Sequence, residues 1–133
     1  MSLEEEKRTL LVKKQMETSD MFMQDARLLL HEKRACSAAG RIYYAVFHAV
    51  AALLIHDGHR VKSHKGAYSM FCQQYVNTGL VPQKYGKWYK NMETMREESD
   101  YNCFYSVTVE DVEFWIAPAK EMIDTISSMV KDN

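Results

Sequence analysis

Apolar residues recur along most of the chain at intervals of three and four, which is the spacing of one face of an α-helix. The clearest example is the C-terminal stripe of Val109, Val112, Ile116, Ala119, Ile123, Ile126 and Val130. Helical rather than alternating spacing prevails, and the 133 residues include only two prolines and five glycines. The pattern predicts an all-α protein.

The first half of the chain predicts two long helices. One begins after Ser2, whose hydroxyl suits an N-cap with Glu5 completing a capping box, and runs to about Leu30. Its expected buried stripe is Phe22, Ala26, Leu29 and Leu30. The second runs from about Ala35 to His56 and ends at Asp57-Gly58, where glycine can take the left-handed conformation. Because it is apolar on most faces, it is expected to be the central helix.

The second half of the chain predicts three further helices. Ser63 is a suitable N-cap for a helix that carries Tyr68, Phe71 and Tyr75 and stops at Thr78-Gly79. The next is expected from Pro82 to about Glu98, followed by a loop over 100–104.

The last helix is expected to begin at a cap formed by Thr108 and Asp111, with a kink at Pro118. Five helices joined by short links predict an antiparallel up-and-down bundle, and the length suits a single domain over residues 1–133.

Charge and composition narrow the class of protein. Seventeen basic and eighteen acidic residues give a net charge of −1, so any contact with nucleic acid must be local. The N-terminus lacks the features of a signal peptide, and no apolar run approaches the ~20 residues needed to span a bilayer. The three widely spaced cysteines, Cys36, Cys72 and Cys103, favour reduced thiols. These features predict a cytoplasmic protein with no membrane partner.

Metal and cofactor sites are not indicated by the sequence. Neither an E-x-x-H nor an H-E-x-x-H motif occurs, and no Gly-rich phosphate loop or nucleophile elbow is present. His56, His59 and His64 straddle a turn without acidic partners at ligand spacing, apart from Asp57. We therefore expect no metal and no cofactor.

Arg41 and His48 are the strongest candidates for chemistry. They stand seven residues apart in the apolar second helix, so their side chains project within roughly 20° of each other and about 10 Å apart along the axis. Histidine exchanges a proton near neutral pH, and the planar guanidinium matches phosphate oxygens. The spacing alone leaves two interpretations open: a phosphodiester site, or an ion-paired arginine and a histidine packed under aromatic rings.

Three motifs in order resemble the HEPN domain (higher eukaryotes and prokaryotes nucleotide-binding). They are the segment from Arg41 to His48, with the sequence Arg-Ile-Tyr-Tyr-Ala-Val-Phe-His, then Ser63-His64-Lys65-Gly66, then the segment from Arg96 to Tyr101. The resemblance covers the chain from about Leu10 to about Val130 and is nearest to the small, stand-alone prokaryotic members.

The resemblance implies a homodimer in which the second-helix motifs of two subunits face a shared cleft. In active HEPN proteins that cleft is a metal-independent endoribonuclease. His48 would then be the general acid/base and Arg41 the group that stabilises charge on the phosphoryl oxygens. The implied role is the toxin of a toxin-antitoxin or defence pair, with a minimal nucleotidyltransferase as the partner.

Other residues receive smaller roles. Tyr44 lies one turn from both Arg41 and His48, so it either orients a phosphate or lines the cleft. His64 and Lys65 are candidates for substrate contact beside local capping and packing. Arg96, Asp100 and Tyr101 are expected to brace a loop through a salt bridge and a buried phenol ring.

Two positions depart from the family pattern and keep an alternative function open. The residue after the arginine is commonly polar in the better-studied nucleases but is Ile42 here, and a tyrosine two positions after the histidine is replaced by Val50. The alternative is a non-catalytic HEPN module that binds nucleotide, RNA or the nucleotidyltransferase partner. Val50 also argues against control by adenylylation of that tyrosine.

Overall fold

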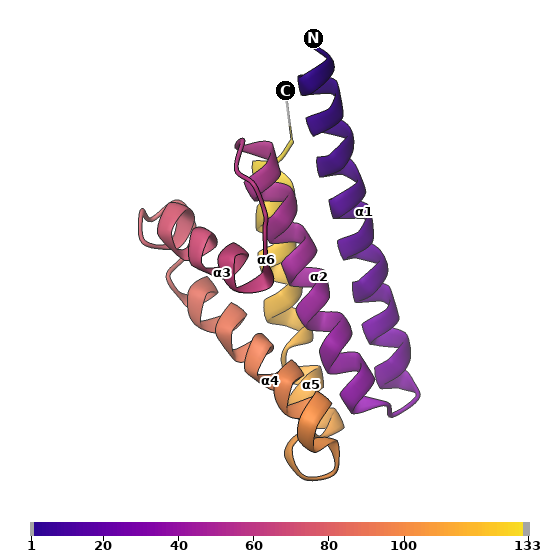
Figure 1. Ribbon diagram of the computed structural model, residues 1–133. Coiled ribbons are helices and arrows are strands. Elements are labelled where there is room, and N and C mark those ends of the chain that lie inside the picture. Colours follow the sequence, from indigo (N-terminus) through magenta and orange to yellow (C-terminus); the bar gives the residue numbers. More distant parts are fainter. Residues whose placement is uncertain (1, 132–133) are drawn as a thin grey trace.

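The computed structural model describes residues 2–131, without the side chains of residues 102–106, and shows a helical bundle (Figure 1). Its elements are α1 (Leu3–His31), α2 (Ala35–His56), α3 (His64–Phe71), the π-helical turn η1 (Cys72–Val76), α4 (Lys84–Ser106), α5 (Val109–Phe114) and α6 (Ile116–Met129). No strand occurs in the described part of the chain. The all-α prediction is confirmed, with α3 and η1 as one helical segment and α5 and α6 as another.

Helix α1 begins at the predicted N-cap, but of the predicted capping box only the bond to the Ser2 hydroxyl is present among the described residues. The Ser2 Oγ atom accepts a hydrogen bond from the Glu5 backbone N–H at 3.1 Å, which satisfies one of the free donors of the first turn. Ala26 and Leu30 of the predicted stripe are buried, whereas Phe22 and Leu29 are half-buried. The exposure of part of Phe22 leaves an aromatic ring at the surface beside α2.

Helix α2 is the centre of the bundle and has the predicted bounds. It packs against α1, α3, α4, α5 and α6, and it ends at a turn in which Gly58 has a φ of +89°. Helix α2 is long and apolar enough to span a membrane, by length and composition alone. No apolar segment of that length was expected from the sequence. Of its most apolar window, 67% is buried inside the protein, so the apolar composition serves the core here.

Helix α3 also starts at the predicted cap. The Ser63 Oγ atom accepts a hydrogen bond from the Gly66 N–H at 2.9 Å. After η1 the chain turns at Gly79, whose φ of +79° favours glycine.

The predicted loop over 100–104 is wrong because α4 continues to Ser106. Neither glycine nor proline occurs between Gly86 and Pro118, so nothing in the sequence breaks the helix there. The expected ion pair forms within this helix, with Arg96 Nη1 at 3.1 Å from Asp100 Oδ2. The expected burial of Tyr101 is also wrong, since this side chain is 90% exposed.

The predicted start of the last helix is confirmed, and the kink is a break. Thr108 and Asp111 form a reciprocal capping box. The chain leaves helical hydrogen bonding at Trp115, between α5 and α6, three residues before Pro118. Proline clashes with the turn before it, which accounts for a break at that point.

The expectation of three reduced cysteines is wrong for Cys36, which is disulfide-bonded. Cys72 is a half-buried free thiol, and the side chain of Cys103 lies outside the described residues. The expectation rested on wide spacing along the chain, which says nothing about distances in the folded protein.

Candidate functional site

Arg41, Tyr44 and His48 of α2 gather around one aromatic ring of α1. The Arg41 guanidinium carbon lies 5.1 Å from the centroid of the Phe22 ring, and the His48 ring centroid lies 5.4 Å from it. Tyr44 meets the same ring edge-on at 6.5 Å. The three candidates therefore lie on one face of α2, with Phe22 as their common neighbour.

A glutamine of α1 fixes the orientation of His48. The Nδ1 atom of His48 lies 2.6 Å from Gln15 Oε1. A carbonyl oxygen only accepts hydrogen bonds, so Nδ1 carries the proton and donates it. In the neutral imidazole the lone pair is then on Nε2, which is the atom available as a proton acceptor.

Burial keeps the His48 imidazole neutral near physiological pH. The half-buried position lowers the pKa of His48 below its usual value of 6.5, and the positive charge that His64 can carry lowers it further. A neutral imidazole with a free Nε2 lone pair can act as a general base.

Arg41 is a cation available to a ligand. Its side chain is exposed, and the described residues place no carboxylate at ion-pair distance from it. Its contact is the face of Phe22, which holds a cation without neutralising it. The ion-paired interpretation of this arginine is therefore not what the structure shows.

His64 comes to the same region from α3. Its ring stacks on Phe47 with a centroid distance of 4.1 Å and an interplanar angle of 11°, and it meets Tyr44 edge-on at 5.4 Å. Its Nδ1 atom lies 3.3 Å from the Tyr43 hydroxyl. Burial lowers the pKa of His64, and the Arg96 guanidinium lowers it further against the opposing effect of Glu93.

Arg96 of α4 adds a second cation beside these rings. Its guanidinium carbon lies 5.0 Å from the Tyr43 ring centroid and 5.7 Å from that of Tyr44. The Arg96 Nε atom is buried without a hydrogen-bond partner in the described structure. A cavity of about 460 Å³ opens here, lined by Tyr43, His64, Lys65, Tyr68, Ser69, Lys90, Glu93, Arg96 and Glu97. His64 and Lys65 thus line a pocket that does not include Arg41 or His48.

Gln15 and Phe22 were not predicted at this site from the sequence. Arg96 was also not predicted beside Tyr43 and Tyr44. Gln15 and Phe22 stand seven residues apart on α1, the same spacing as Arg41 and His48 on α2. Seven-residue spacing places each pair on one face of its own helix, but which faces meet depends on how the two helices pack, so the sequence carries no signal for this contact.

The two positions that depart from the family pattern lie in the core. Ile42 and Val50 are both fully buried, on the faces of α2 that pack against the other helices. Position 42 therefore contributes packing here and brings no polar group to the side of Arg41.

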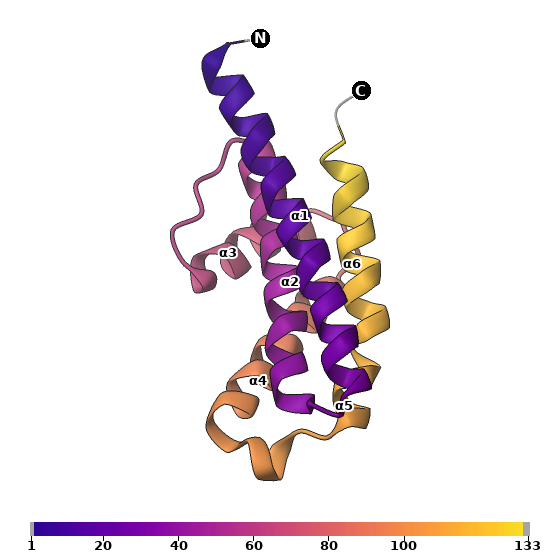
Figure 2. The same cartoon turned by 90° about the vertical axis from the view of Figure 1, so that its right-hand side faces the viewer.

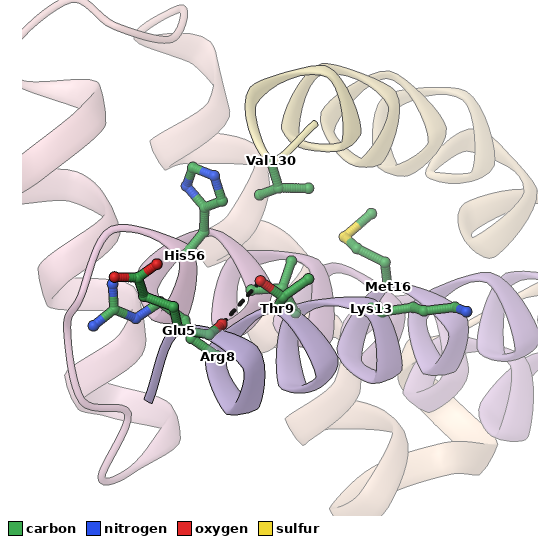
Figure 3. A pocket seen from close by; sticks show the side chains of 8 residues that line it. Glu5, Arg8, Thr9, Lys13, Met16, His56 and Val130 are labelled. Carbon is green, nitrogen blue, oxygen red and sulfur yellow. Dashed lines mark hydrogen bonds between the residues drawn. The ribbon is translucent and has the colours of Figure 1, made fainter. Parts of the chain in front are cut away.

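A larger cavity lies away from these residues. It has a volume of about 650 Å³ and is lined by Glu5, Arg8, Thr9, Val12, Lys13, Met16, His56 and Val130. Figure 3 shows it between the first half of α1, the end of α2 and the end of α6. Its charged rim mixes Glu5 with Arg8 and Lys13, and none of the candidate residues lines it.

A comparison with protein families identifies the class of this helical bundle. Residues 12–129 match the model of the HEPN domain, which includes α2 to α6 and most of α1. The chain belongs to the HEPN family.

Particular relatives are prokaryotic. The chain is 37% identical over 110 residues to a UPF0332 protein of Thermotoga maritima, covering 83% of each chain. It is 30% identical over 117 residues to "Putative toxin MJ0605" of Methanocaldococcus jannaschii, covering 88% of this chain and 87% of that one. The crystal structure of TT1696 from Thermus thermophilus has the same fold, with a TM-score of 0.75 at 13% identity over 88% of this chain and 96% of that one.

Proposed function

We propose that this protein is a cytoplasmic ribonuclease of the HEPN type that acts as a homodimer and serves as the toxin of a toxin-antitoxin or defence pair. The observation that carries the proposal is the pairing of an exposed, carboxylate-free Arg41 with a neutral His48 whose Nε2 lone pair is available. The toxin role is suggested by the name of the relative from Methanocaldococcus jannaschii. The family resemblance implies a minimal nucleotidyltransferase as the antitoxin partner.

The proposed chemistry uses no metal. His48 Nε2 takes the proton from a ribose 2′-hydroxyl, and the oxygen attacks the adjacent phosphorus as the bond to the 5′-oxygen breaks. Arg41 stabilises the negative charge on the phosphoryl oxygens. The leaving 5′-oxygen takes a proton from the protonated His48 of the second subunit, so that one histidine per chain supplies both the base and the acid. The products are a 2′,3′-cyclic phosphate and a 5′-hydroxyl.

Tyr44, His64 and Lys65 are proposed to contact the substrate beside the scissile phosphate. The Phe47–His64 stack and the edge of Tyr44 offer aromatic surface to an unpaired base, and Lys65 offers a positive charge to the neighbouring phosphate. A stacked base is recognised without strong sequence preference, which suits single-stranded RNA.

The deciding assay is cleavage of single-stranded RNA in EDTA. Wild-type protein is compared with His48→Ala and Arg41→Ala, with His31→Ala and Arg8→Ala as matched controls at exposed positions away from the pair. We expect cyclic phosphate ends from the wild type and both controls, and a loss of at least about a hundredfold in the two site variants. Equal cleavage by all five proteins, or none on diverse RNAs, would refute the proposal.

A non-catalytic nucleotide- or RNA-binding module is the second candidate, and the buried Ile42 favours it. Without a polar group beside Arg41, the site has one fewer donor to hold the phosphate in place. This candidate predicts that labelled RNA binds with a strong dependence on salt and on Arg41 while the RNA stays intact. Fluorescence anisotropy followed by gel analysis of the same sample separates the two functions.

A further inference from the structure

The cavity of about 460 Å³ lies where α2, α3 and α4 meet. Figure 2 shows α3 on the side of α2 that lies away from α6. The cavity shares one wall with the candidate site, because His64 lines it and also stacks on Phe47. The Phe47 ring centroid in turn lies 5.3 Å from that of His48. A group bound in this cavity is therefore a close neighbour of a group bound at His48.

The walls of this cavity are aromatic rings with cations beside them. Tyr43 of α2 and Tyr68 of α3 line it, and the fully buried ring of Tyr89 lies 6.2 and 5.1 Å from theirs. The Arg96 guanidinium carbon lies 5.0 Å from the Tyr43 centroid, and Lys90 Nζ lies 5.5 Å from that of Tyr68. Aromatic walls favour a flat ligand with a ring system of its own.

Two hydrogen-bond donors around the cavity lack partners. Arg96 Nε and the Tyr89 hydroxyl are both buried without a hydrogen-bond partner in the described part of the chain. Burial raises the pKa of Tyr89 far above its usual range, and Tyr43 and Glu93 of the cavity lining raise it further, so this hydroxyl stays protonated. Unpaired buried donors are rare and costly in proteins. A ligand that brings hydrogen-bond acceptors is therefore favoured here.

Two carboxylates in the lining make the cavity unsuitable for a bare anion. Glu93 and Glu97 stand one helical turn apart on α4. Glu93 Oε1 is held by Lys90 Nζ at 2.9 Å. Glu97 Oε1 lies 3.9 Å from Arg96 Nη2, which is too far for a hydrogen bond, and its side chain is 52% exposed. The ligand that fits must therefore donate hydrogen bonds to Glu97 as well as accept them from Arg96.

A flat ring with donors and acceptors on its edges describes a nucleobase, and proteins bind unpaired RNA bases by stacking and by hydrogen bonds to these edges. Guanine matches the two charged groups. Its O6 and N7 atoms are acceptors for arginine, and its N1–H and N2–H₂ groups are adjacent donors that one carboxylate binds with both oxygens. Adenine, cytosine and uracil each place an acceptor beside the donor on that edge, and a carboxylate repels it.

We infer that this cavity binds a guanine base of the RNA, next to the phosphate at His48, with Glu97 accepting from N1 and N2 and Arg96 donating to O6. The inference rests on the proposed function and deepens it, because it gives the cleavage a base preference. The preference concerns one nucleotide only. A second base, stacked on the ring pair of Phe47 and His64, is bound without preference.

Substitution in the RNA tests the inference without changing the protein. The substrate is a single-stranded oligouridine that contains one guanosine, cleaved in EDTA. Cleavage beside the guanosine should be at least about tenfold faster than between uridines, since hydrogen bonds to charged groups are lost with uracil. Inosine lacks the N2 amino group and should lower this rate about tenfold, whereas adenosine should abolish the preference.

A variant of the carboxylate tests the assigned contact. Glu97→Gln should cleave the guanosine and inosine RNAs at equal rates, because the amide keeps a single acceptor oxygen, for N1–H. Glu98→Gln is the matched control, an exposed glutamate of the same helix outside this cavity, and should keep the preference. Circular dichroism checks that both variants keep the helical fold.

Binding measurements keep this inference separate from the proposed nuclease. Fluorescence anisotropy with the His48→Ala protein should show at least about tenfold tighter binding of the guanosine RNA than of the inosine RNA. Such selective binding without cleavage by the wild type supports the guanine cavity and refutes the nuclease. Cleavage without preference for guanosine supports the nuclease and overturns the guanine cavity. Equal binding of the two RNAs, or a preference that survives in Glu97→Gln, also overturns it.

Discussion

Replacing Gln15 with glutamate should raise the pKa of His48. The substitution exchanges the neutral oxygen that lies 2.6 Å from His48 Nδ1 for a carboxylate oxygen of the same reach. An opposite charge at this distance shifts a pKa by about one to three units. Because His48 is only half-buried, solvent screens part of the effect, and we expect about one unit.

The same change alters how stability depends on pH. In the wild type the pKa of His48 lies below its unfolded value of 6.5, so stability rises with pH up to that value and is constant above it. Raising the folded pKa by about one unit removes about 1.4 kcal/mol of this acid penalty. Gln15→Glu should therefore gain up to about 1.4 kcal/mol on the wild type as the pH falls from about 8 to 5, where the new carboxylate is ionised throughout.

Two measurements check the reasoning. Proton NMR titration follows the imidazole signal that disappears in His48→Ala, and urea unfolding at both pH values gives the free energies. Gln15→Leu is the control: it should cost about 1 kcal/mol at both pH values, since burial still lowers the pKa of His48 while the Nδ1–H loses its acceptor. An unchanged pKa of His48 in Gln15→Glu would refute the assigned hydrogen bond.

Three further outcomes follow from the structure. The proposed cleavage needs one neutral and one protonated His48, so its rate should follow a bell-shaped pH profile with a maximum below about pH 6.5, and a maximum above pH 7.5 would contradict the division of roles. Met92→Ala, at a fully buried position, should reduce the free energy of unfolding by about 2–5 kcal/mol in urea titrations. Thr108→Ala removes the α5 cap and should cost about 1 kcal/mol by the same titration, while Thr78→Ala, whose hydroxyl donates to the Gln74 carbonyl and accepts from no helix N-terminus, serves as its control.

Helix starts and ends were predictable where a local chemical signal sets them. Ser2, Ser63 and Thr108 act as caps through their own hydroxyl groups, and the bonds are between residues three apart. The end of α4 carried no such signal. A charged segment such as 96–101 is compatible with a loop or with the exposed side of a helix, and only the absence of glycine and proline favoured the helix.

The site was predictable only on the helix that carries the motif. The seven-residue spacing of Arg41 and His48 predicts that they share a face of α2. The contacts of both side chains with Phe22 confirm it. Gln15 lies on α1, 33 residues before His48, and Arg96 lies on α4. The contacts of both residues with the site depend on how the helices cross. The exposure of the Arg41 side chain likewise depends on how its neighbouring helices pack, which the sequence does not specify.

Helix α1 serves the core, the candidate site and the solvent with three different sides. Its core face is fixed by Ala26 and Leu30, and its edge holds His48 through Gln15, whereas its outer face repeats apolar residues with a different period. A helix that served only the bundle would gain nothing from Leu10 and Met21, since burial inside one chain does not involve them. The outer row is therefore available for a contact outside the single chain, whereas the side that carries Gln15 is already used inside it.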